Sequence, residues 1–67
     1  MKLRITTDYI KLDSFLKLSG AAATGGHAKQ MILDGLVKVN SEECFLRGKK
    51  LKTGDKIQIQ DEVFEIV

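Results

Sequence analysis

The sequence contains no proline or tryptophan, a single cysteine and no long apolar run. Cys44 alone cannot form a disulfide within the chain, which favours a reducing compartment. The longest uninterrupted apolar stretches, such as 21–23 and 31–33, have three residues each, whereas a membrane-spanning helix needs about 20. Met1 to Thr7 alternates charged and apolar side chains, so it lacks the apolar core of a signal peptide. We therefore expect a cytoplasmic protein that does not enter a membrane.

Catalytic side chains are equally scarce. His27 is the only histidine, and near a predicted helix start it is expected to be an exposed polar residue rather than a catalyst. Cys44 follows an acidic residue, which disfavours the thiolate, so a structural role is favoured over a nucleophilic one. The aspartates are scattered at predicted helix ends and turns, where they form local hydrogen bonds. The sequence thus predicts no enzyme, no metal site and no cofactor.

The length of the chain limits the size of its core. The 67 residues are enough for one domain, residues 1–67, and a domain of this size buries only about 60% of the surface of its unfolded chain. A composition of 43% hydrophobic and 30% charged residues is typical of a soluble globular protein.

Tyr9 can lie in the core or at the surface, and the aromatic residues form no stacking platform. Three of them are predicted to lie in the core: Phe15, Phe45 and Phe64.

The first half of the chain predicts one strand and two helices. Residues 2–7 alternate, with Leu3 and Ile5 on one side, as in a short strand. Two sets of apolar residues then follow at the i, i+3, i+4 spacing of amphipathic helices: Leu12, Phe15 and Leu16, and Ala28, Met31 and Ile32. Gly20 is expected to end the first helix, Thr24 to cap the start of the second, and Gly35 to end it. Such short helices must pack on each other and on a sheet.

The second half predicts strands. Short apolar or alternating runs indicate four of them, at 36–39, 44–46, 56–60 and 63–67. Turns are expected between them at Asn40-Ser41, Thr53 to Asp55 and Asp61-Glu62. A strand, two helices and then several strands make an α+β fold. In it, two short helices pack on one side of a small, mainly antiparallel sheet.

The first candidate binding segment is Thr24-Gly25-Gly26-His27-Ala28-Lys29, at the start of the second helix. The first amides of a helix lack intrahelical partners and carry partial positive charge. Glycines there remove side chains that would keep a phosphate away from these amides, although each costs roughly 1 kcal/mol of helix stability relative to alanine. The alternative is that Gly25 and Gly26 only permit tight packing against the first helix. The segment alone does not decide between the two.

The second candidate is the basic segment, residues 47–52, which has four cations and no acid: Arg47, Lys49, Lys50 and Lys52. Residues 57–67, by contrast, contain three acids and no cation. Segregated charge is typical of proteins that bind polyanions, although basic runs are also common in solvated turns. Lys11 opens the first helix, where the helix dipole disfavours a cation, so we expect another interaction to use it.

Four blocks of the sequence together resemble a known family: Ile10 to Leu16, Thr24 to Lys29, Gly35 to Asn40 and Leu51 to Ile57. In order and spacing they resemble the RNA-binding domain of ribosomal small-subunit protein four (the S-four domain, or alpha-L motif), over about residues 10–59. Within that family the chain looks like the small stand-alone bacterial members of the YaaA or YbcJ type. Two departures are visible. Ser41 occupies the position after the hairpin asparagine, where the family usually has glycine. Residues 25–27 occupy the start of the second helix, which is arginine-rich in many members.

The resemblance implies that the helices and the following hairpin clamp double-stranded or junction RNA through its backbone. By position it assigns contacts to Lys11, Thr24, Gly25, Gly26 and Lys29, and to Arg47, Lys49 and Lys50 in a loop that is often basic in the family. Together with His27 and Lys52 from the two candidate segments, these residues form the predicted RNA contact set. The expected partner of the monomer is structured RNA, either ribosomal RNA or an assembling ribosomal particle. The alternative is a protein-interaction adaptor with the same fold.

Overall fold

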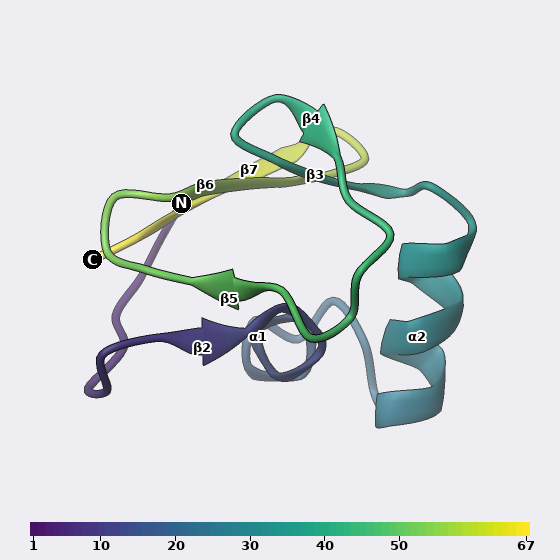
Figure 1. Cartoon of the computed structure of the whole chain (residues 1–67), viewed down its shortest axis with the longest axis horizontal. Helices are drawn as coiled ribbons and strands as arrows, with labels where there is room; N and C mark the ends of the chain where they lie inside the picture. Colours follow the sequence, from purple (N-terminus) through teal and green to yellow (C-terminus); the bar gives the residue numbers. More distant parts are fainter.

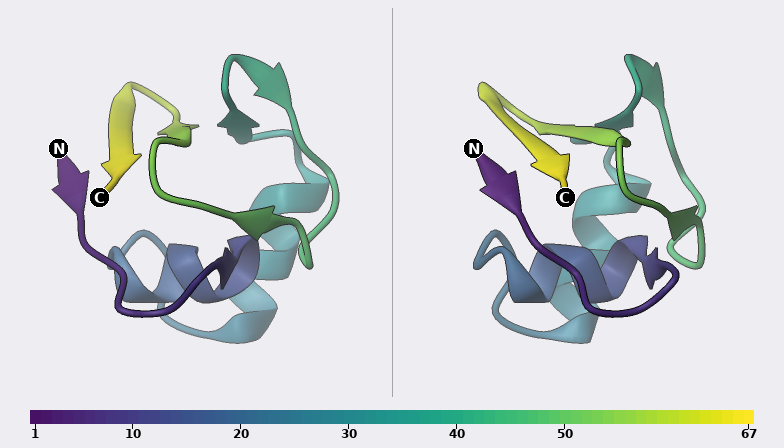
Figure 2. Two further views of the ribbon diagram at one scale, coloured as in Figure 1. Left: turned by 60° about the vertical axis from the view of Figure 1, so that its left-hand side comes forward. Right: turned by 90° about the vertical axis from the view of Figure 1, so that its left-hand side faces the viewer.

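The computed structural model describes residues 1–67 and arranges them in two layers (Figure 1). A five-stranded sheet has the strand order β1-β7-β6-β3-β4. In that order its strands are Lys2–Leu3, Glu62–Ile66, Lys56–Ile59, Val37–Val39 and Glu42–Glu43. Two helices, α1 (Leu12–Leu18) and α2 (Gly25–Leu33), lie on one side of this sheet (Figure 2). A separate two-stranded ribbon pairs β2 (Ile10–Lys11) with β5 (Lys50–Leu51). The predicted α+β fold is confirmed.

Both helices form where the apolar spacing predicts them. The residues of the two predicted stripes are all buried: Leu12, Phe15, Leu16, Ala28, Met31 and Ile32. Gly20 and Gly35 follow the helices with φ of 84° and 76°, the left-handed conformation that ends a helix most easily at glycine. Thr24 caps α2, because its side chain accepts a hydrogen bond from the backbone N–H of His27 at 3.1 Å. The predicted helix boundaries are therefore confirmed.

Alternate residues of the sheet close the core from the other side. Ile57 and Ile59 of β6 and Phe64 and Ile66 of β7 point inward and are buried. The Phe64 ring meets that of Phe15 edge-on, with centroids 5.7 Å apart and planes at 85°, a favoured aromatic geometry. The antiparallel pairs β3–β4, β3–β6 and β6–β7 account for most of the sheet, and only β1 runs parallel to its neighbour, β7.

The turn between β3 and β4 falls at Asn40-Ser41, as predicted. Val39 pairs with Glu42, so the loop has two residues. Asn40 and Ser41 have φ of 51° and 74°. Positive φ at both central residues is the requirement of a type I′ hairpin turn, which matches the twist of the strands. The structure thus settles the turn type and places a serine in a backbone conformation that favours glycine.

Some predicted boundaries are wrong. The first strand covers only Lys2–Leu3 rather than residues 2–7. After it, Ile5 makes one further backbone contact with the sheet, through its N–H to the Val67 carbonyl at 3.0 Å. The last hairpin turns at Gln60-Asp61, because Ile59 pairs with Glu62. No strand was predicted for the ribbon of β2 and β5.

The largest difference concerns residues 44–46. A strand was predicted there, but β4 occupies Glu42–Glu43 and the chain then leaves the sheet. Only the Cys44 N–H still bonds to the Val37 carbonyl, at 3.1 Å. Phe45 consequently does not reach the core, and 54% of its surface is exposed. The prediction of Phe45 as a core residue is therefore wrong, whereas those of Phe15 and Phe64 are confirmed.

Candidate nucleic-acid interface

The ribbon of β2 and β5 places two cations opposite each other. Lys11 and Lys50 are direct partners in this antiparallel pair, and both are exposed. Like charges at directly opposed positions destabilise a strand pair, so folding alone does not favour this arrangement. The ammonium of Lys50 also lies 4.9 Å from the centre of the Tyr9 ring, in a cation–π contact. Tyr9, left open by the sequence, is 41% exposed and extends this cationic surface.

The backbone of the basic segment caps α1. The amides of Leu12 and Asp13, which have no intrahelical partner, donate to the carbonyls of Lys49 and Arg47 at 2.9 and 3.0 Å. Lys11 is the N-cap residue, but its side chain makes no capping bond. The capping role usually filled by a side chain is thus taken by the basic segment. As a result, the backbone of residues 47–49 lies against the start of α1, next to Lys11.

The start of α2 is open. Its first backbone hydrogen bond runs from the Ala28 N–H to the Thr24 carbonyl at 3.0 Å. The amides of Gly25 and Gly26 come before this bond and have no partner within the helix. Both glycines are exposed. A Cβ added to Gly25 would meet only the Lys17 ammonium at 4.0 Å, and one on Gly26 only the Thr24 hydroxyl at 3.9 Å. Tight packing against α1 therefore does not explain the two glycines.

His27 reinforces the cap of α2. While its N–H donates to Thr24, its ring Nδ1 accepts from the Ala23 N–H at 3.3 Å. This reciprocal arrangement resembles a capping box, in which the third helical residue reaches back across the helix start. His27 is exposed, as predicted, and its bonds give it a positioning role at the helix start.

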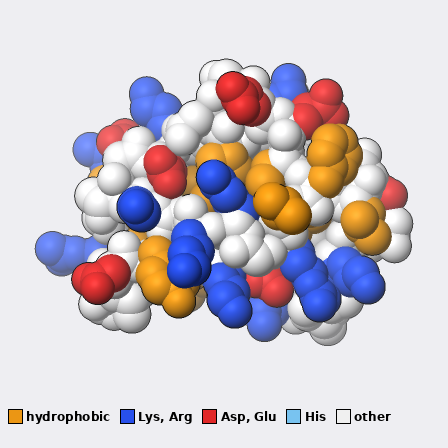
Figure 3. Space-filling model, viewed as in Figure 1, with side chains coloured by type: hydrophobic (Ala, Val, Ile, Leu, Met, Phe, Trp, Pro, Cys, Tyr) orange, Lys and Arg blue, Asp and Glu red, His pale blue; other side chains and the backbone are white.

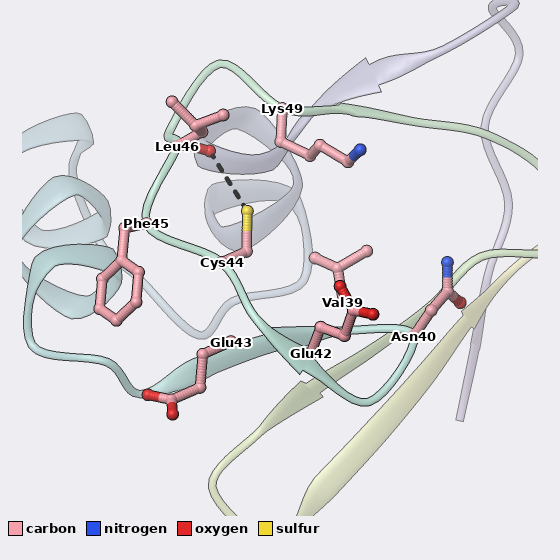
Figure 4. Close-up of a pocket in the computed structure, with 8 residues that line it drawn as sticks. All are labelled: Val39, Asn40, Glu42, Glu43, Cys44, Phe45, Leu46 and Lys49. Atoms are coloured by element: carbon pink, nitrogen blue, oxygen red, sulfur yellow. Dashed lines mark hydrogen bonds between the residues drawn. The ribbon is translucent and has the colours of Figure 1, made fainter.

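The structure brings part of the predicted RNA contact set together: Lys11 lies opposite Lys50, and Lys29 lies near Arg47, whereas Lys49 lines another hollow with Glu42 and Glu43 (Figure 4). Lys29 and Arg47 line one hollow between α2 and the loop after β4. In the space-filling view of Figure 3, Lys and Arg side chains gather along the lower half of the molecule, with few carboxylates among them. Lys52 directly follows β5, and its N–H donates to Asp55 Oδ2 at 2.8 Å. All residues of the set are exposed.

No group of three or more His, Cys, Asp or Glu side chains is placed to hold a metal ion. Neither helix has the length and apolar character that crossing a bilayer requires. The geometry therefore defines a small α+β domain with an exposed cationic face.

The chain belongs to the S4 domain family, whose sequence profile matches residues 3–67. Among characterised relatives, the "Probable ribosome maturation protein RlbA" of Bacillus subtilis (strain 168) is 40% identical over 58 residues, covering 87% of this chain and 82% of that protein. Among solved structures, the fold is similar to part of a pseudouridylate synthase, with a TM-score of 0.74 and 26% identity over 81% of this chain. The match covers only 23% of that enzyme.

Proposed function

We propose that this chain is a cytoplasmic, monomeric RNA-binding module without catalytic activity of its own. It recognises structured RNA through the backbone, on ribosomal RNA or an assembling ribosomal particle. The residues that contact the RNA are those of the predicted RNA contact set, with Lys52 at its margin. Double-stranded RNA is recognised largely by shape and through its phosphates and 2′-hydroxyls, and a cationic face with an open helix start suits such contacts.

The pairing of Lys11 with Lys50 carries this proposal. The two residues are far apart in the sequence, and the fold places them side by side on a strand pair that their charges disfavour. A polyanion bound across the ribbon would relieve that repulsion. The carbonyls of Lys49 and Arg47 accept hydrogen bonds from the first amides of α1, and these bonds hold the basic segment beside the ribbon. Nothing in the packing of the core requires four cations here.

The relatives support the same function. RlbA carries the name of a ribosome maturation protein and matches this chain over most of both lengths. The pseudouridylate synthase matches over less than a quarter of its length, so the similarity concerns only part of that enzyme. These relationships favour an RNA-directed role in ribosome assembly in which any chemistry belongs to another chain.

The rival function is a protein-interaction adaptor. A net charge of only +2 and the exposed side chains of Phe45 and Leu46, 54% and 69% accessible, favour it. Titration of a labelled ribosomal RNA fragment at several salt concentrations distinguishes the two. RNA binding through phosphates weakens steeply with salt, whereas an apolar protein interface does not. Crosslinking in cells, followed by sequencing of the attached RNA, then identifies the target.

A further inference from the structure

A hollow of about 260 Å³ lies between α2 and the loop after β4. Its walls are the apolar side chains of Ile32, Leu33, Phe45 and Leu46, and its rim carries the cations Lys29 and Arg47. No carboxylate lines it. Its volume is slightly below the ~300–1,000 Å³ typical of sites for whole small ligands, so a single flat ring fits it better than a larger molecule.

The apolar walls are exposed without a partner inside the chain. Leu33, Phe45 and Leu46 leave 55%, 54% and 69% of their surfaces accessible. Figure 4 draws the neighbouring hollow, to which Phe45 and Leu46 also belong, and in it the Phe45 ring lies on the side of α2, away from Val39 and Lys49. One ring atom lies 3.6 Å from the point where a Cβ on Gly35 would be. The ring edge is thus held against the end of α2, while much of the side chain stays open to solvent.

We propose that this hollow takes one unpaired nucleobase of the bound RNA, stacked on Phe45 between α2 and the loop. The inference rests on the proposed function and narrows its substrate to structured RNA with a bulged or looped-out nucleotide. Unpaired bases in loops and bulges are recognised by stacking on aromatic side chains. Such stacking tolerates any base, because every base has a π-face.

The charges around the hollow favour a base over an apolar segment of a protein. Lys29 and Arg47 approach it from α2 and from the basic segment, on different sides. A looped-out nucleotide carries a phosphate on each side of its base, which matches two cations flanking an apolar centre. The hollow is also continuous with the candidate RNA interface, since Arg47 belongs to the hollow and its carbonyl caps α1. One RNA can therefore occupy both.

The test compares two RNA hairpins, each closed by a non-nucleotide linker in place of a loop, that differ only in one bulged nucleotide. Wild-type protein should bind the bulged hairpin more tightly. Phe45→Ala should weaken that complex by roughly fivefold to 150-fold, the range for losing one stacking aromatic, and leave the fully paired hairpin unchanged. Phe45→Trp should retain the preference. Leu46→Ala changes a second exposed wall of the same hollow. Val63→Ala is the matched control, because Val63 is an apolar residue of β7 outside the hollow, with 47% of its surface exposed. Thermal melts verify that each variant is folded.

Three other outcomes overturn the inference. If wild type binds both hairpins equally and Phe45→Ala changes neither, the hollow takes no base, although the proposed function stands. If Phe45→Ala weakens both hairpins alike, the ring serves general binding and not an unpaired base. If neither hairpin binds even at low salt, the proposed function fails as well. In that case, binding of a peptide that carries both acidic and apolar side chains to the wild-type protein would identify a protein partner.

Discussion

The side-chain amide of Asn40 donates a hydrogen bond to Asp55 Oδ1 at 3.1 Å, across 15 residues of chain. Each partner also bonds to backbone: Asn40 Oδ1 accepts from the Lys56 N–H at 2.9 Å, and Asp55 Oδ2 from the Lys52 N–H at 2.8 Å. The pair thereby joins the type I′ turn to the loop that follows the basic segment. It fixes the end of the basic segment relative to the sheet.

Asp55→Ala should destabilise the fold by about 1–2 kcal/mol, because it removes two hydrogen bonds to a charged group. In a chain of this size 1 kcal/mol lowers the melting temperature by roughly 4–8 °C. Asp61→Ala, at the exposed turn between β6 and β7, is the control and should change stability by less than about 0.5 kcal/mol. Equal melting temperatures for the two variants would contradict a structural role for the Asn40–Asp55 pair.

Ser41→Gly should stabilise the protein by about 0.5–1 kcal/mol. At a φ of 74° the serine side chain incurs a left-handed backbone penalty that glycine avoids, although glycine also gains entropy in the unfolded chain. Ser41→Ala keeps the Cβ and should give no such gain. Urea denaturation of both variants is the measurement, and a loss of stability in Ser41→Gly would contradict the turn assignment.

Gly26→Ala should stabilise the fold by roughly 0.5–1 kcal/mol, because alanine is the better helix former and the space around Gly26 is open. Gly26→Leu should leave the fold intact but reduce RNA affinity, since its side chain blocks the approach of a phosphate to the first amides of α2. Thermal melts and RNA titrations on the same two variants provide both readouts. If Gly26→Leu binds RNA like the wild type, phosphate does not approach the amides there.

The purified protein should modify no RNA. The one histidine is exposed, and no cluster of side chains is placed to hold a metal ion. Cys44 lines a hollow with Glu42, Glu43 and Lys49, but its thiol donates to the Leu46 carbonyl at 3.8 Å and has no histidine beside it to act as a base. Mass spectrometry of ribosomal RNA, after incubation with the protein in the presence and absence of small cofactors, measures this directly. A new base modification that depends on the protein would refute the non-catalytic assignment.

The sequence was most informative about the helices and least about the ribbon. Apolar residues repeating at helical spacing, with a glycine after each stripe, predicted α1 and α2 closely, because each helix is specified by its own residues. The ribbon depends on pairing between residues 10–11 and 50–51, and two-residue strands leave no periodic pattern. Phe45 was misplaced for a similar reason. The course of its loop is set by the distant start of α1, whose amides bond to the basic segment.

The candidate site was only partly predictable. Charge segregation in the sequence identified the basic segment, and the glycines identified the start of α2. The opposition of Lys11 and Lys50, the contact of Lys50 with Tyr9 and the hollow beside Phe45 all depend on tertiary structure. No complementarity between the two sequences marks the ribbon, because the directly opposed residues Lys11 and Lys50 carry like charges.

The most direct test of the account compares two triple variants with equal loss of charge. The first, Arg47→Ala with Lys49→Ala and Lys50→Ala, removes three cations of the basic segment. The second, Lys2→Ala with Lys38→Ala and Lys56→Ala, removes three exposed cations of the five-stranded sheet. The measurement is the slope of log K against log salt for a structured RNA. Each lost phosphate contact lowers the slope by about 0.7–0.9, so the first variant should lose roughly 2–3 and the second almost nothing. Equal slopes in the two folded variants would show that the basic segment is not the RNA-binding surface.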